Sequence, residues 1–175
     1  HVTGELRFDQ PIPPALLAAA KVRPDLAGTR PVITFASVVE GEDDIYLSAI
    51  EAVLKGPNPP FVIYVPRKPE RFDETAARLA ARGLNTVRRS QIFDENLHPG
   101  PLVRADILLG DSLGEMYFYL ALADRVVTGG GFTPHGAHNI IEPLALKRPV
   151  IVGPEIHTIE YPAVEAIAAG VCLRV

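Results

Sequence analysis

Three basic side chains stand together where a helix is expected to begin. Arg67, Lys68 and Arg71 follow directly on the apolar run 61–65. The helix dipole disfavours positive charge at this end, so the cluster needs a compensating partner. A bound phosphate would be one, with Arg67 donating paired charge-assisted hydrogen bonds. The alternative is a solvated surface partly neutralised by the neighbouring glutamate, Glu70.

A glycine-rich segment over residues 128–143 is the second candidate. Gly130 and Gly131 belong to a run of three glycines, and such a run permits backbone conformations closed to other residues. We expect its free amide groups to face an anionic ligand. Asn139 and Glu142 stand three apart where a helix should begin, so capping is one reading of them. The other is ligand binding, in which the Glu142 carboxylate would accept hydrogen bonds from both hydroxyls of a ribose.

Two shorter segments could also touch a ligand. Ser37 follows an apolar run and could donate a hydrogen bond to a phosphate or sugar oxygen, although a plain helix cap is an equal alternative. Gly114 is costly inside a first helical turn unless a ligand approaches the backbone there, which would place Glu115 and Met116 beside it. Ser112 and Glu115 also have the spacing of a capping box.

Metal and thiol chemistry find little support. His135 and His138 have a spacing compatible with a metal, but no nearby cysteine or carboxylate completes a tetrahedral set. We therefore expect no metal and no cofactor. Cys172 is the only cysteine and lies in an apolar run, so we interpret it as a packing residue in a protein of a reducing compartment.

The elements that must position these residues alternate between strand-like and helical patterns. This rhythm predicts an α/β fold with a Rossmann-like, doubly wound parallel sheet. Ligands of such sheets bind beyond the carboxyl ends of the strands, where all the segments above lie. Strands are expected at 31–36, 61–65, 85–88, 106–110, 125–128, 149–152 and 171–173. Helices are expected at 15–21, 42–55, 69–83, 113–121, 140–146 and 159–169.

The chain divides into a short linker and one domain. Residues 1–14 carry several prolines and read as a linker from a preceding domain, and residues 15–175 form the ligand-binding domain. Residues 90–104 are expected to be an irregular loop that joins two halves, the second half beginning with the run 106–110. A net charge of -4 argues against nucleic acid as a partner. No apolar run is long enough to span a bilayer.

Four linked motifs resemble the Kdo (3-deoxy-D-manno-octulosonic acid) transferases of bacterial lipopolysaccharide synthesis. They are TGELRFD at 3–9, PRKPERF at 66–72, GDSLGEM at 110–116, and GGGF at 129–132 followed by GAHNIIEP at 136–143. The resemblance covers nearly all of the chain. It implies the C-terminal half of a GT-B fold, in which two Rossmann-like domains face each other and this one binds the donor, CMP-Kdo.

The resemblance also implies roles and partners. Ser37, Arg67 and Lys68 would contact the donor, as would Gly114, Glu115 and Met116, and the glycine-rich loop would add Gly130, Gly131, His138, Asn139 and Glu142. The acceptor would be a lipid A precursor at the cytoplasmic face of the inner membrane, reached through an N-terminal domain and a peripheral membrane contact outside this chain. The catalytic carboxylate belongs to that domain, so no catalytic residue is expected here and the chain alone should not catalyse transfer.

Departures from the family pattern leave other functions open. Val38 and Val39 replace a usual Thr-His pair, Lys68 replaces a histidine and Gly131 a serine. The alternatives are a GT-B transferase that uses a UDP- or ADP-sugar, a UDP-sugar epimerase, and a non-catalytic Rossmann-type nucleotide-binding module.

Overall fold

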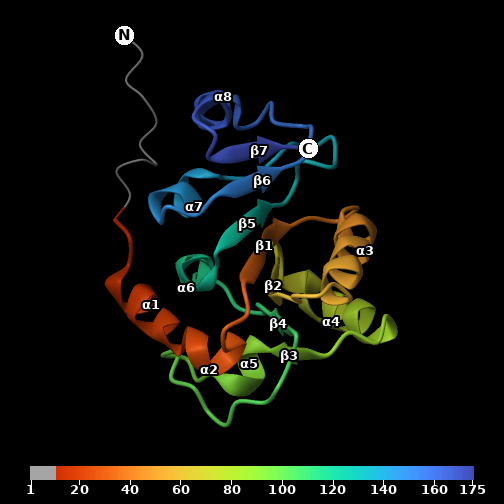
Figure 1. The fold of residues 1–175 in the computed structure, drawn as a ribbon, viewed down its shortest axis with the longest axis vertical. Helices are drawn as coiled ribbons and strands as arrows, with labels where there is room; N and C mark the ends of the chain where they lie inside the picture. Colours follow the sequence, from red (N-terminus) through yellow and green to blue (C-terminus); the bar gives the residue numbers. More distant parts are fainter. Residues whose placement is uncertain (1–10) are drawn as a thin grey trace.

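Seven parallel strands form the centre of the protein, which is described by a computed structural model over residues 11–175 (Figure 1). The order across the sheet is β3-β4-β2-β1-β5-β6-β7. The strands are β1 Val32–Val38, β2 Phe61–Pro66, β3 Thr86–Arg88, β4 Ile107–Leu109, β5 Arg125–Thr128, β6 Val150–Val152 and β7 Cys172–Arg174. The central strands are apolar almost throughout because both faces of a parallel sheet are covered.

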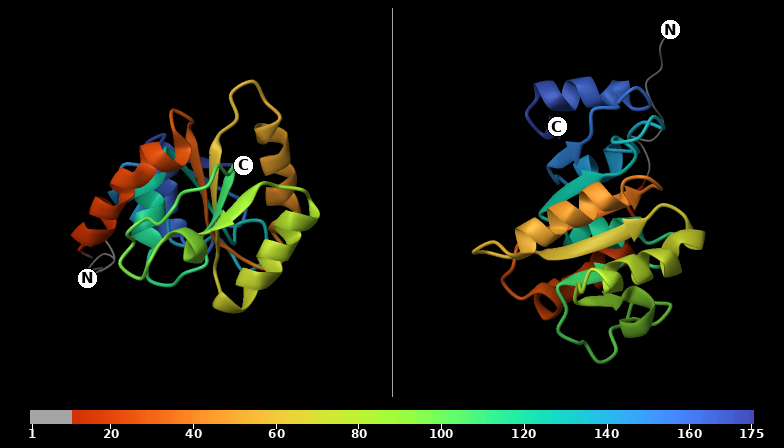
Figure 2. Two further views of the ribbon diagram at one scale, coloured as in Figure 1. Left: turned by 90° about the horizontal axis from the view of Figure 1, so that it is seen from below. Right: turned by 90° about the vertical axis from the view of Figure 1, so that its right-hand side faces the viewer.

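Helices cover both faces of the sheet (Figure 2). The helices are α1 Pro14–Ala19, α2 Arg23–Ala27, α3 Asp43–Leu54, α4 Phe72–Ala81, α5 Arg89–Ile92, α6 Met116–Leu122, α7 Ile141–Ala145 and α8 Glu160–Ala168, with 3-10 turns η2 Ala20–Val22 and η3 Pro69–Arg71. On one face α3 and α4 bury Leu47 and Leu79 in a shared core. On the other, Phe118 of α6 packs with Val22 of η2 in a second core.

The predicted fold class is confirmed, but three local expectations were wrong. Residues 106–110 do not open the second half of the sheet, because β4 inserts between β2 and β3 and so belongs to the first half. The segment 90–104 is not irregular throughout, since Arg89–Ile92 forms the short helix α5. The helix predicted from residue 113 begins at Met116, and α2 was not predicted at all.

The predicted linker can be followed only in part. Residues 1–10 lie outside the described part of the chain. The helix α1 begins at Pro14, which is the last residue of the predicted linker. The boundary therefore stays a prediction. Within residues 11–175 no helix combines the length and apolar character needed to cross a bilayer.

The order of the strands fixes where a ligand can enter. β1 pairs with β2 on one side and with β5 on the other, so the chain leaves β1 toward one half of the sheet and later returns to build the other. Loops that leave the carboxyl ends of β1 and β5 therefore diverge and open a crevice between them.

Candidate ligand-binding site at the switch point

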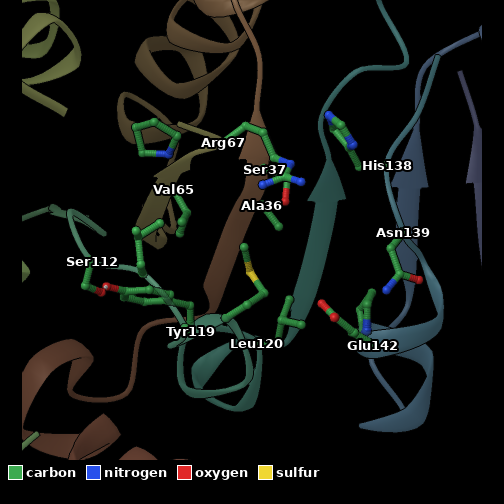
Figure 3. A pocket seen from close by; sticks show the side chains of 15 residues that line it. Ala36, Ser37, Val65, Arg67, Ser112, Tyr119, Leu120, His138, Asn139 and Glu142 are labelled. Carbon is green, nitrogen blue, oxygen red and sulfur yellow. Dashed lines mark hydrogen bonds between the residues drawn. The ribbon is translucent and has the colours of Figure 1, made fainter. Parts of the chain in front are cut away.

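A cavity of about 380 Å³ lies at this crevice. Its volume is within the range of small-molecule sites. It is lined by Ala36, Ser37, Val65, Pro66, Arg67, Ser112, Leu113, Gly114, Met116, Tyr119, Leu120, His138, Asn139, Glu142 and Pro143. Figure 3 shows Asn139 and Glu142 on one side of the cavity and Ser37 and Arg67 on the other. The sequence-predicted residues Ser37, Arg67, Gly114, Met116, His138, Asn139 and Glu142 thus meet around one space.

Ser37 occupies a strained backbone position at the end of β1. Its φ is 57°, a left-handed conformation that residues with a Cβ adopt rarely. The register between β1 and β2 shifts at this point, between Phe35 and Val38. Gly129 packs so closely that a Cβ there would lie 2.3 Å from the Ser37 carbonyl oxygen. Backbone strain held in place by tight packing is a common feature of ligand sites, and Ser37 lines the cavity in this state.

Arg67 brings positive charge to the cavity. Its backbone N–H donates to the Val38 carbonyl at 2.8 Å, which fixes the loop after β2 against the end of β1. Its exposed side chain makes no ion pair within residues 11–175. Arg71 differs, because its guanidinium is buried and forms an ion pair with the buried carboxylate of Asp43. The anion expected from the basic cluster therefore has Arg67 and Lys68 available as partners, whereas Arg71 already has one.

The opposite wall comes from the segment after β5. The Asn139 Oδ1 accepts a hydrogen bond from the Ile141 N–H at 2.8 Å in a turn just before α7, and Asn139 also lines the cavity. Ile140 is the N-cap and no side chain caps this helix, so the capping interpretation of Asn139 and Glu142 was wrong. Glu142 lies half-buried in the first turn of α7. Burial, and then the charge of Arg67, lower the pKa of His138. A neutral imidazole therefore faces the cavity at neutral pH, and its buried Nε2 has no hydrogen-bond partner within residues 11–175.

The glycine-rich loop does not offer its amides to a ligand as the sequence predicted. The N–H of Gly130 donates to both carboxylate oxygens of Glu42 at 2.8 Å, and the N–H of Phe132 donates to Glu42 at 3.1 Å. Gly131 packs against Gly153, where a Cβ would lie 2.7 Å from the Gly153 nitrogen. Gly130 and Gly131 are buried and lie outside the cavity lining. An internal carboxylate thus takes the place that was assigned to a bound anion.

Glu42 is the residue that sequence reasoning missed. It is fully buried, and besides the two loop amides it accepts hydrogen bonds from the Val39 N–H at 3.2 Å and from the Tyr46 hydroxyl at 3.1 Å. Burial and the neighbouring Glu42 charge raise the pKa of Tyr46, which remains a neutral donor. Glu42 therefore joins the loop after β1 to the loop after β5. The available signal was a pair of acidic residues, Glu42 and Asp43, at the start of the helix that follows the first apolar strand.

The segment 110–116 contributes to the cavity in part. Gly114 and Met116 line it. Gly114 has a φ of 77°, a backbone conformation that by itself favours glycine, so this residue can be explained without a bound ligand. Glu115 lies outside the lining because its carboxylate is paired with Arg89 and accepts from the Ser112 hydroxyl. No side chain caps α6, so the predicted capping box is wrong and Ser112 bonds to the Glu115 side chain instead.

The remaining sequence candidates lie outside the cavity. Lys68 is exposed and lines a neighbouring cavity. Cys172 is buried in the core under α8, and burial raises the pKa of its thiol, which agrees with the packing role predicted for it. Among residues 11–175 no group of three or more histidine, cysteine or acidic side chains is arranged to hold a metal ion.

Comparisons with known proteins point in one direction. No family model matches the chain. It is 46% identical to the 3-deoxy-D-manno-octulosonic acid transferase of Bordetella pertussis over 99% of its own length and 40% of that protein. The enzyme of the same name from Haemophilus influenzae is 35% identical over 94% of the chain and 37% of that protein. The chain thus spans about two fifths of these curated relatives.

A solved structure has the same fold. The crystal structure of the C-terminal CMP-Kdo binding domain of WaaA from Acinetobacter baumannii superposes with a TM-score of 0.80 at 30% sequence identity. The match covers 93% of this chain and 82% of that domain. The similarity therefore extends over most of both molecules.

Proposed function

Because this chain belongs to the 3-deoxy-D-manno-octulosonic acid transferase family as a C-terminal domain, we propose that its cavity binds the nucleotide-sugar donor CMP-Kdo. One observation carries the proposal: a cavity of about 380 Å³ at the switch point has the Arg67 cation on one wall and Asn139 with Glu142 on the other. That pairing of a cation with polar acceptors suits a ligand that has both a phosphate and sugar hydroxyls.

The residues around the cavity take different roles in this proposal. Arg67 binds the phosphate and offsets the negative charge that develops on it when the sugar leaves. Glu142 accepts hydrogen bonds from the ribose hydroxyls, and Ser37 donates to a phosphate or sugar oxygen. Met116 and the backbone at Gly114 line the nucleoside side of the cavity.

The complete enzyme would combine this domain with one outside the chain. We propose that an N-terminal domain, facing this one as in a GT-B fold, holds the lipid A precursor and the catalytic carboxylate. Transfer of Kdo would then take place in the cleft between the two, with inversion at the anomeric carbon, at the cytoplasmic face of the inner membrane. Membrane contact would be peripheral and made by parts of the protein outside this chain.

Calorimetric titration of the chain with CMP, UMP and ADP tests donor recognition. We expect CMP to bind most tightly, and the chain alone to show no transferase turnover with CMP-Kdo and acceptor. Tighter binding of UMP or ADP would favour a transferase or epimerase for another nucleotide-sugar. Absence of binding by all three nucleotides, or turnover by the chain alone, would contradict the proposal.

A further inference from the structure

A second cavity of about 430 Å³ lies beside the first. It is lined by Val39, Glu40, Arg67, Lys68, Arg71, His135 and His138, and we call it the cationic cavity. Arg67 and His138 line both cavities, so these two side chains mark the border between them. The two spaces are therefore adjacent parts of one longer site.

The charges in the cationic cavity favour an acidic ligand that also carries hydroxyl groups. The Arg71 guanidinium is used internally, by Asp43 and by the Val38 carbonyl oxygen at 3.3 Å. Lys68 is exposed, and within residues 11–175 its ammonium group has no ion pair or hydrogen bond. Glu40 adds one negative charge, and its carboxylate can accept hydrogen bonds from hydroxyl groups.

The order of the two cavities matches the order of groups in a nucleotide-sugar. In such a donor the phosphate lies between the nucleoside and the sugar. In this protein Arg67, the side chain suited to the phosphate, lies between two cavities. One has polar and apolar walls, and the other holds Lys68, a second cation that has no ion pair among the described residues. A neutral sugar would leave this second cation without a partner, whereas an acidic sugar would use it.

We propose that the cationic cavity binds the sugar of the donor and that Lys68 forms an ion pair with its carboxylate, which makes Lys68 the residue that selects acidic over neutral sugars. The inference rests on the proposed function, in that it takes the first cavity to hold the nucleotide. Glu40 and His135 then bind hydroxyl groups of the same sugar.

The test uses the full-length enzyme with CMP-Kdo as donor and CMP as a competitive inhibitor. For Lys68→Met and Lys68→Gln we expect the KM for the donor to rise about tenfold, because a charge-assisted hydrogen bond is lost. The inhibition constant of CMP should stay within about twofold, because CMP has no sugar acid. Lys68→Arg should restore most of the donor affinity. Lys55→Met is the matched control, since Lys55 is an exposed lysine at the end of α3, opposite the site.

Two outcomes would overturn the assignment of Lys68. An unchanged KM in Lys68→Met and Lys68→Gln would show that Lys68 does not bind the sugar. A parallel rise in KM and in the CMP inhibition constant would show that Lys68 contacts the nucleotide instead. Neither outcome bears on the proposed function, which in this experiment fails if CMP does not inhibit the unaltered enzyme. Thermal melting of each variant verifies that the exposed substitutions leave the fold intact.

Discussion

Two loops at the same edge of the sheet are built by opposite means. The cation loop, residues 67–71 after β2, keeps Arg67 and Lys68 exposed and without ion pairs in the described part of the chain. The glycine loop, residues 129–138 after β5, has two of its amides on the buried carboxylate of Glu42. One loop presents charge to the solvent, whereas the other satisfies its polar groups from within.

This difference indicates that the two loops have different roles, one in the proposed ligand binding and the other in supporting the cavity wall. The glycine loop needs no ligand to satisfy the amides of Gly130 and Phe132, so its shape exists before anything binds. It thereby fixes the start of the segment that carries His138, Asn139 and Glu142 to the cavity wall. In the proposed function, side chains would therefore bind the ligand, and the glycine loop would hold them in place.

Removal of the internal carboxylate should have the largest effect on stability. Glu42→Ala leaves the Val39, Gly130 and Phe132 amides without their acceptor in a buried site, and we expect a loss of about 3 kcal/mol or more in the free energy of unfolding. Glu42→Gln keeps one acceptor oxygen, so its free energy of unfolding should lie between those of the unaltered protein and Glu42→Ala. Urea denaturation followed by circular dichroism measures both.

Glu74→Ala is the control for Glu42. Glu74 is a half-exposed carboxylate that pairs with Arg78 on the surface of α4, and its loss should cost less than about 1 kcal/mol. Equal destabilisation by Glu42→Ala and Glu74→Ala would mean that the carboxylate does not hold the glycine loop.

Addition of a methyl group at the joint between β1 and β5 should have an intermediate effect. In Gly129→Ala the new Cβ meets backbone atoms of Ser37 and Val38 at 2.3–2.9 Å, and backbone cannot move aside as a flexible side chain can. We expect a destabilisation of about 1–3 kcal/mol in urea denaturation. In the control, Gly100→Ala, the nearest atom lies 3.7 Å away, and the change should stay within about 0.5 kcal/mol. A Gly129 variant as stable as the control would show that the contact yields.

A change in the cation loop should affect stability least and binding most. Arg67→Ala removes an exposed side chain without an ion pair in the described residues, so the free energy of unfolding should change by less than about 0.5 kcal/mol. Affinity for CMP should fall about tenfold or more in calorimetry, because a charge-assisted phosphate contact is lost. Arg104→Ala, at an exposed arginine before β4, should change neither. Unaltered CMP affinity in Arg67→Ala would contradict the view that the cation loop binds the ligand while the glycine loop only supports the site.

The fold was predictable where the pattern along the chain is strong. Apolar runs such as 61–65 predicted the strands, because a strand buried on both faces has to be apolar almost throughout. The position of β4 was not predictable from this rhythm, since alternation gives the sequence of elements but not their order across the sheet. The helix α5 was missed because it has only four residues and lies beside a segment rich in proline and glycine. At its start the Arg88 N–H donates to the Gln91 side chain.

The site was predictable in its location and less so in its contacts. The rule that ligands bind beyond the carboxyl ends of strands brought Arg67, Asn139 and Glu142 to one cavity. The partners of the glycine loop could not be found in this way, because Glu42 lies 88 residues before Gly130. For the same reason the sequence did not indicate that Glu115 pairs with Arg89, 26 residues away.

The left-handed Ser37 pressed against Gly129 has a further consequence for how this protein could be redesigned. The two halves of the sheet are in close backbone contact there, so we expect a change at either residue to shift both walls of the cavity. Positions 67–70, by contrast, are exposed to solvent, and Arg67 among them lines the cavity. A new donor preference is therefore best sought by varying positions 67–70 while Ser37 and Gly129 are kept unchanged.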